Sequence, residues 1–291
     1  MDATLARNVD PAVAAFAARL ADEKPALGVL FYGSNLRTGL REGVLDFYIL
    51  TDGDAETGLW PTVSYREWEY EGETLRAKIA TMTLHKFTEA ARGETIDTTI
   101  WARFVQPSAL VWCRDEAARL NIAAAIEAAA ITAARLAAAA GPPSGQEEDY
   151  WRALFRHTYR AEFRVEKPGR EDSILSLNPD HFTGLLPDAL AAGGIAYGND
   201  NGMLTPRISV AERKRILAWW ERCRRMGKPL NIARLARATR TFDGAARYAA
   251  WKVERHTGEK IEITPFREKH PILFSPAIAF KLWRAQRKRR E

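Results

Sequence analysis

The stretch Phe31-Tyr32-Gly33-Ser34, followed by Leu45-Asp46-Phe47-Tyr48-Ile49-Leu50, decides the fold that we expect for this chain. An apolar run over residues 26–32 ends in Gly-Ser, and after a gap an aspartate lies inside a second apolar run. This pattern predicts two strands, over residues 26–33 and 44–51, joined by a turn. Glycine lets a backbone approach phosphate groups closely, and an aspartate on the neighbouring strand can hold Mg²⁺ against them. An ordinary strand–turn–strand unit with Gly-Ser in its turn is the alternative.

The same order of an apolar residue, Gly-Ser, a gap of this length and an aspartate in a strand resembles the signature of polymerase-β-type nucleotidyltransferases. The resemblance implies an α/β fold in which Gly33 and Ser34 cradle a triphosphate and Asp46 binds Mg²⁺. An incoming oxygen then displaces pyrophosphate in line. The usual signature has a second carboxylate two residues after the first, and here that position is Tyr48.

Composition indicates a globular protein of two domains, or one domain with a long appendage. The chain has 291 residues, of which 46% are hydrophobic and 27% charged. The two cysteines lie far apart, so they form neither a metal-ligand spacing nor a disulfide framework, and a reducing compartment is expected. No uninterrupted apolar run reaches the ~18 residues of a membrane span, and the N-terminus carries neither a secretory signal nor a transit peptide. The abundance of alanine and arginine is typical of GC-rich bacterial genes.

Charge is divided unevenly along the chain. The whole chain carries a net charge of +6, but residues 207–291 hold 23 basic and 8 acidic residues, a net charge of +15. The preceding residues carry the opposite excess, −9. A basic second part of this kind predicts contact with a polyanion, either nucleic acid or an anionic membrane.

Periodicity and capping signals predict the remaining elements. A third strand is expected over residues 75–84, and an extended edge that contains Arg103 over residues 100–113. The aromatic stretch 60–70 is expected to be irregular, either a substrate wall or, in preference, a packed loop. Helices are expected over residues 11–23, 85–92, 116–140 and 146–157, then from Ser209 with Glu212 as a capping box to about residue 226, and within 231–255.

Two basic residues on the predicted strands could meet phosphate charge. Lys78 and Arg103 would flank the Gly33-Ser34 turn if the third strand and the extended edge join the sheet. The alternative for both is a surface position with the charged group in solvent.

The stretch 271–290 combines apolar and aromatic side chains with five basic residues near its end. Ser275-Pro276 can start a helix there. The segment is too short to span a bilayer but suits an anionic membrane interface. A helix docked on the protein and a nucleic-acid-binding tail are the two alternatives.

Several stretches in their order resemble the soluble, mitochondrial-type phosphatidate cytidylyltransferases of the translocator assembly and maintenance family. That family has an aliphatic residue two positions after the aspartate and a further aspartate at the end of the strand, here Tyr48 and Asp52. Gln106 stands where that family usually has a lysine, and its histidine-rich segment has no counterpart. The stretches that carry the resemblance are Tyr32-Gly33-Ser34, Asp46-Phe47-Tyr48, Lys78-Ile79-Ala80, residues 103–107, Asn121, residues 158–164 and, loosely, 241–252.

This resemblance implies transfer of CMP from CTP to phosphatidate with Mg²⁺ as cofactor. The composition of the chain and its basic C-terminal segment predict the cytoplasmic surface of the inner membrane as its location. Asp46 and either Asp52 or Glu162 would be the carboxylates of the metal site. Six residues of a straight strand separate Asp46 from Asp52 by ~20 Å, which counts against Asp52 unless the turn folds back. The residues that would contact the nucleotide or neutralise its phosphates are Tyr32, Gly33, Ser34, Lys78, Arg103 and Arg164.

The fold that we expect is therefore α/β, in three parts. A polymerase-β-like nucleotidyltransferase sheet domain covers residues 1–115, a helical domain covers 116–240, and a basic, amphipathic, membrane-associating region covers 241–291. Two other functions stay open. One is a nucleotidyltransferase that acts on RNA or another small acceptor. The other is a membrane-associated scaffold without catalytic activity, for which Tyr48 is the main argument.

Overall fold

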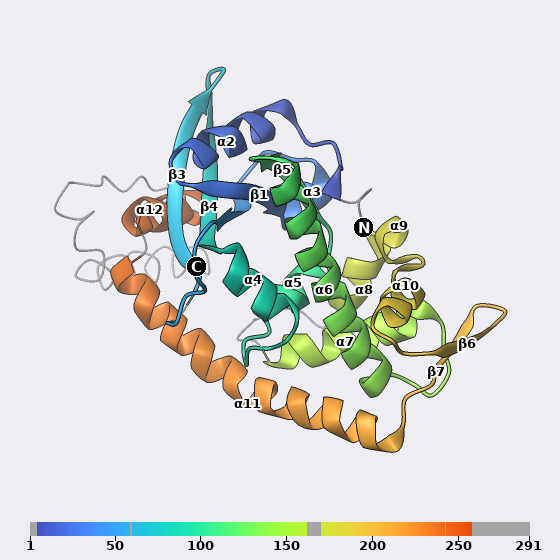
Figure 1. Cartoon of the computed structure of the whole chain (residues 1–291). Coiled ribbons are helices and arrows are strands. Elements are labelled where there is room, and N and C mark those ends of the chain that lie inside the picture. The colour runs from blue at the N-terminus through green and yellow to red at the C-terminus, as the bar shows by residue number, and fades with distance from the viewer. Residues whose placement is uncertain (1–4, 59, 162–169, 242, 258–291) are drawn as a thin grey trace, which may run out of the picture.

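A five-stranded mixed sheet forms one part of the molecule. The computed structural model describes residues 5–58, 60–161, 170–241 and 243–257. The strand order is β3-β4-β2-β1-β5, in which β2 and β4 are parallel and the other neighbours antiparallel (Figure 1). The strands are β1 (Ala26–Tyr32), β2 (Leu45–Thr51), β3 (Thr62–Tyr70), β4 (Glu73–Thr83) and β5 (Ser108–Cys113). The predicted strands over residues 26–33, 44–51 and 75–84 are thus confirmed as β1, β2 and β4.

The prediction of an irregular stretch over residues 60–70 is wrong, because β3 occupies most of it. β3 pairs with β4 from Thr62 opposite Thr81 to Tyr70 opposite Glu73, and Glu71-Gly72 forms the tight turn between them. Both turn residues have positive φ, 49° and 83°, as a two-residue hairpin requires. β3 lies at the edge of the sheet with many of its residues exposed, so it lacks the continuous apolar run that marks a central strand.

The prediction that Arg103 lies in an extended edge is also wrong. Residues 99–104 form a short helix, α5 (Thr99–Phe104), and the edge strand β5 begins only at Ser108. Ile100, Trp101 and Phe104 are buried at helical spacing, which fixes the helix against the core. Arg103 therefore projects from a helix instead of a strand.

Helices cover both faces of the sheet, as Figure 1 shows. On one face α2 (Pro11–Asp22) packs its buried side, and the ring centroid of Phe16 lies 6.0 Å from that of Phe47 on β2. On the other face lie α4 (Leu84–Ala91), α5 and α6 (Glu116–Ala140). Because side chains alternate along a strand, Phe47 faces α2 whereas Asp46 and Tyr48 face the second layer.

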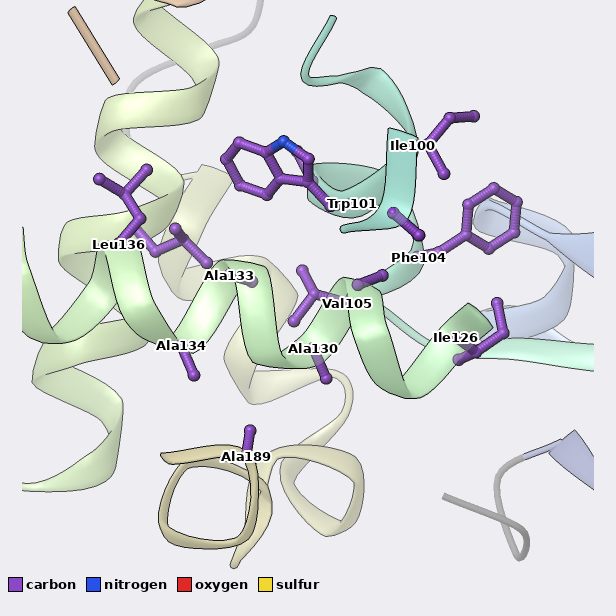
Figure 2. Packing of buried hydrophobic residues seen from close by; sticks show 14 of the residues in the cluster. Ile100, Trp101, Phe104, Val105, Ile126, Ala130, Ala133, Ala134, Leu136 and Ala189 are labelled. Atoms are coloured by element: carbon purple, nitrogen blue, oxygen red, sulfur yellow. The ribbon is translucent and has the colours of Figure 1, made fainter. Parts of the chain in front are cut away.

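The predicted helix over residues 116–140 is confirmed as α6, the central helix of the structure. Its alanines allow neighbours to approach closely on several sides. In Figure 2, Trp101 and Val105 lie on one side of α6 and Ala189 on the opposite side. By length and composition α6 is the one helix among the described residues that could cross a membrane, yet 67% of its apolar window is buried inside the protein. This burial is typical of a core helix.

One hydrophobic cluster runs from the sheet through α6 into the helical part. It joins Leu30 on β1 to Leu154 on α7 (Glu147–Ala161) and Leu190 on α10 (Leu185–Ala192). The core therefore continues across residues 115 and 116, where we predict a domain boundary. The smaller elements of this part are α8 (Arg170–Ser176), α9 (Pro179–Phe182) and the hairpin β6 (Tyr197–Asp200) and β7 (Met203–Pro206).

A long basic helix, α11 (Val210–Thr241), runs along the molecule from the β6–β7 hairpin to α12 (Ala245–Thr257) beside β3 (Figure 1). Its predicted start is confirmed, since the Ser209 hydroxyl accepts a hydrogen bond from the Glu212 N–H at 3.1 Å. Its predicted end near residue 226 is wrong, because the helix continues through Pro229 along α6, α7 and β3. The segment 271–290 lies outside the described residues, so its membrane, docking and nucleic-acid interpretations remain predictions.

Candidate functional site

Three predicted site residues stand side by side on three neighbouring strands. Tyr32 at the end of β1 pairs with Asp46 on β2, and Asp46 pairs with Lys78 on β4. Cross-strand partners project to the same face of a sheet, so the three side chains form a row. They line a cavity of about 270 Å³, and the full set of lining residues is Tyr32, Gly33, Ser34, Arg37, Asp46, Lys78, Arg103, Gln106, Pro107 and Tyr159. All described residues to which we assign nucleotide binding therefore meet in one place.

Gly33 lies at the point where the chain leaves β1 and turns into the short helix α3 (Ser34–Thr38). Its φ is +91°, a value that L side chains rarely adopt. A Cβ at this position would come 2.9 Å from Asp46 Oδ2. Glycine is thus required both by backbone conformation and by the close approach of the turn to the carboxylate.

Asn35 fixes the loop that returns from this turn to β2, and sequence reasoning did not single it out. Its buried side-chain amide donates hydrogen bonds to the carbonyl oxygens of Leu40 and Glu42, each at 2.8 Å. These bonds close the loop and hold β1 and β2 in register near Asp46. A polar residue directly after Gly-Ser is the sequence signal, but its partners become visible only once the loop is folded.

Arg103 enters the cavity from α5, above the row on the sheet. Its guanidinium carbon lies 5.3 Å from the centroid of the Tyr32 ring, a cation–π distance. Gln106 follows on the same segment and donates a hydrogen bond to the Ala102 carbonyl at 3.2 Å. Arg37, Tyr159 and Asn35 are the residues here that the sequence reasoning left without a role. Arg103 thus lies on a helix and not on the predicted strand, but it still lies beside the Gly33-Ser34 turn, as predicted.

Asp46 is the one carboxylate among the described lining residues, and three cations surround it. Burial raises the pKa of Asp46 above its ordinary value, whereas Lys78, Arg103 and Arg37 act in the opposite direction. Lys78, Arg103 and Arg37 thus bring three positive charges to the described part of the cavity, beside the carboxylate of Asp46. The cavity therefore suits a ligand that brings several negative charges of its own.

Tyr48 occupies the position where the nucleotidyltransferase signature has its second carboxylate. Its side chain is fully buried, and its ring centroid lies 5.3 Å from that of Phe104 and 5.8 Å from that of Tyr32. Burial raises the pKa of the Tyr48 phenol, so it is neutral at physiological pH. Tyr48 therefore packs against the lining residue Tyr32 from inside the core and supplies no metal-binding charge.

The structure does not bring Asp52 to Asp46. Asp52 follows the far end of β2, where its side chain is exposed and Oδ2 lies 3.6 Å from Arg114 Nη1. β2 pairs with β4 without a break from Leu45 to Thr51, so the distance of ~20 Å that counts against Asp52 still applies. Glu162 and Arg164 lie outside the described residues, and their roles remain predictions.

The described residues around Asp46 can hold Mg²⁺ only together with the phosphates of a bound substrate. Within the described part of the chain, no three carboxylate, histidine or cysteine side chains gather to form a metal site of their own. Mg²⁺ is nevertheless commonly held by one or two carboxylates together with substrate phosphates. Asp46 can supply one such ligand to an ion that arrives with a triphosphate.

Comparisons with known proteins add no relative to this description. No protein-family model matches the chain, and no curated protein matches it.

Proposed function

We propose that this protein is a nucleotidyltransferase that transfers CMP from CTP to phosphatidate at an anionic membrane surface, with release of pyrophosphate. The observation that carries the proposal is the row of Tyr32, Asp46 and Lys78 beneath a positive-φ glycine turn, with Arg103 above it. The choice of CTP and phosphatidate comes from the motif resemblance, whereas the cytoplasmic membrane surface comes from the composition of the chain and its basic C-terminal segment. The mixed sheet, with Gly-Ser after β1 and an aspartate on β2, also supports a polymerase-β-type nucleotidyltransferase fold.

Seven of the lining residues have a defined task in this reaction. The backbone at Gly33 and Ser34 approaches the triphosphate, and Asp46 holds Mg²⁺, which would polarise the phosphoryl oxygens when bound. Lys78, Arg103 and Arg37 offset the negative charge of the phosphates, which moves onto the leaving group as the reaction proceeds. Tyr32 braces Arg103 through its ring.

The chemical step balances without a redox partner. An oxygen of the acceptor phosphate attacks the α-phosphorus of CTP, and the bond from that phosphorus to the bridging oxygen breaks. The electron pair of that bond leaves with pyrophosphate. The cations that line the cavity would offset the negative charge of this group as it departs.

A direct assay tests the proposal. Purified full-length protein is incubated with Mg²⁺, phosphatidate vesicles and each of four labelled nucleotides, CTP, ATP, GTP and UTP. We expect label in the lipid fraction and release of pyrophosphate with CTP, and neither product with Asp46→Asn. Label in no lipid with any nucleotide overturns the lipid acceptor, and label in added RNA instead identifies a polynucleotide acceptor.

A nucleotide-binding protein without catalysis is the second candidate, because a buried Tyr48 stands where the nucleotidyltransferase signature has its second carboxylate. This candidate predicts that CTP binds to the protein and that Arg103→Gln weakens the binding, whereas no pyrophosphate appears with any acceptor. Turnover that is lost in Asp46→Asn excludes it.

A further inference from the structure

A second cavity, of about 290 Å³, lies between α6, α11 and the end of α4. We call it the arginine cavity. Its lining residues are Arg92, Gly93, Thr132, Arg135, Arg215, Ile216, Trp219 and Arg222. It shares no lining residue with the cavity around Asp46. It therefore needs an explanation of its own.

Four arginines line this cavity, of which Arg135 is half-buried and the other three are exposed, and none of its described lining residues is acidic. Arg215 has a partner in Glu212, at 3.4 Å. The nearby Glu221 binds Arg224 at 2.7 Å and Arg225 at 2.9 Å, so it is already engaged on the same helix. Within the described residues, no ion pair joins Arg92, Arg135 or Arg222 to a carboxylate. Like charges held together in this way repel one another unless an anion lies between them.

The floor of the arginine cavity is held by hydrogen bonds and close packing. The Trp219 indole N–H donates to the Gly93 carbonyl at 3.1 Å, and the buried Thr132 hydroxyl donates to the Ala91 carbonyl at 2.8 Å. Gly93 has φ +71°, and a Cβ there would come 3.0 Å from both Trp219 and Thr132. The arginines thus extend from three helix segments that are fixed against one another, and Arg215 and Arg222 lie two helical turns apart on α11.

We propose that the arginine cavity binds a small phosphate-bearing anion with two or more negative charges, at a site separate from the Asp46 cavity. Guanidinium forks match phosphate oxygens in bidentate pairs and keep their charge at all physiological pH values. The volume is near the lower limit of about 300–1,000 Å³ for ligand sites, so it fits a compact anion. A free diphosphate and the phosphate headgroup of a lipid share this chemistry.

Calorimetric titration of the full-length protein with inorganic pyrophosphate tests the proposal. The protein carries Arg103→Gln, so that binding in the Asp46 cavity is weakened. We expect saturable binding at one site, which Arg135→Gln with Arg222→Gln weakens about tenfold or more. The matched control is Arg224→Gln with Arg225→Gln, which removes the same charge from the same helix outside the cavity and should change affinity by less than about twofold. Circular dichroism melts establish that each variant is folded.

Vesicles that contain phosphatidate provide the second arm and identify the source of the anion. If the vesicles compete with pyrophosphate for binding to the protein, and only Arg135→Gln with Arg222→Gln abolishes this competition, the cavity binds a lipid headgroup. Pyrophosphate binding without competition assigns it to a free anion. Equal weakening by both double variants overturns the proposal, because the effect would then be general charge. Absence of pyrophosphate binding in the Arg103→Gln protein overturns it too. Binding of single-stranded oligonucleotides in place of pyrophosphate, in the same calorimetric titration, also overturns it.

Discussion

The Asp46 cavity and the arginine cavity are similar in size and rich in arginine, but they differ in what accompanies the cations. The Asp46 cavity lies at the ends of strands and combines one partly buried carboxylate with Lys78 and Arg103. The arginine cavity lies between helices and has no acidic lining residue. A carboxylate among cations can hold a metal ion on a phosphate, whereas cations alone can only bind the phosphate. The comparison therefore supports the proposed chemistry in the first cavity and the proposed binding in the second.

The largest effect that separates the two cavities is expected from Asp46→Asn. The substitution removes the one negative charge among the described lining residues of the first cavity and little volume, so transfer should fall by at least about 10³-fold, or about 4 kcal/mol of transition-state stabilisation. The melting temperature and pyrophosphate binding in the arginine cavity should not change. Nucleotide-transfer rates and calorimetry on the same preparation measure both. Near wild-type turnover would show that Asp46 has no role in the reaction.

The second effect concerns the ion pair between Asp97 and Arg234, which connects the two regions. Asp97 is only 3% exposed and accepts hydrogen bonds at 2.9 Å from the Thr99 N–H and hydroxyl at the start of α5, while Arg234 reaches it from α11. Asp97→Ala leaves a largely buried guanidinium without its partner, so the free energy of unfolding should fall by about 3–5 kcal/mol. Urea unfolding followed by circular dichroism measures it.

The matched control for this pair is Glu221→Gln, which breaks an exposed ion pair on α11 and should leave the unfolding midpoint nearly unchanged. Because α5 carries Arg103 and α11 carries Arg222, loss of the buried pair should also weaken ligand binding in both cavities. If Asp97→Ala unfolds no more easily than the control, the pair does not connect the two regions.

The third effect comes from Arg103→Gln, which should lower kcat/KM about 10²-fold. The reason is that, in the proposed reaction, Arg103 would offset charge that moves onto the leaving pyrophosphate. Steady-state kinetics with CTP measure the change, and Arg222→Gln is the control, because it removes the same charge from the arginine cavity. A larger loss of activity in Arg222→Gln than in Arg103→Gln would reverse our assignment of chemistry and binding.

Most residues of the Asp46 cavity, but not Arg37 and Tyr159, could be predicted from sequence because they follow from strand period and a turn. Gly33 requires a positive φ and Asp46 lies one strand away, so their meeting is local in the sheet. Lys78 also followed, since a third strand beside β2 brings it into register. Arg103 was predicted at the right place on the wrong element, because six residues of apolar sequence do not distinguish a strand from a short buried helix.

The arginine cavity could not be predicted in the same way. Arg92, Arg135 and Arg222 are far apart in the chain, and each alone resembles an ordinary surface residue. Their meeting depends on how α11 crosses α6, which is a property of tertiary packing. The early end that we predicted for α11 shows the same limit. A proline such as Pro229 is typical of a helix end, but here the helix continues beyond Pro229 because it is packed against its neighbours.

A smaller effect is the pH dependence of transfer. The metal-binding form of Asp46 is the carboxylate, and burial raises its pKa. The active fraction should therefore fall as the pH drops, beginning above the pH near 4 at which an ordinary aspartate is protonated. A profile of kcat/KM against pH measures this acidic limb. The described lining residues of the arginine cavity include no group that titrates in this acidic range. If the affinity of the arginine cavity for pyrophosphate also falls in this pH range, after correction for protonation of the ligand, the contrast between the two sites is contradicted.

The smallest effect is expected from Asp52→Asn. Asp52 is exposed beyond the end of β2, and its ion pair with Arg114 lies on the surface. Exposed pairs of this kind contribute little to stability, and ~20 Å separates Asp52 from Asp46, which is too far to share one metal ion. We therefore expect transfer rates within about twofold of the wild type, and an unchanged melting temperature.

The value of this variant lies in its comparison with Asp46→Asn and with Glu162→Gln. If Asp46→Asn alone abolishes transfer, one carboxylate with the substrate phosphates suffices in the Asp46 cavity, and the contrast with the arginine cavity depends on a single charge. If Glu162→Gln matches Asp46→Asn, the second ligand comes from the chain that follows α7. A loss in Asp52→Asn as large as in Asp46→Asn would mean that the turn after β2 folds back toward the cavity during the reaction. In that case the straight β2 seen here could not be the arrangement in which transfer takes place.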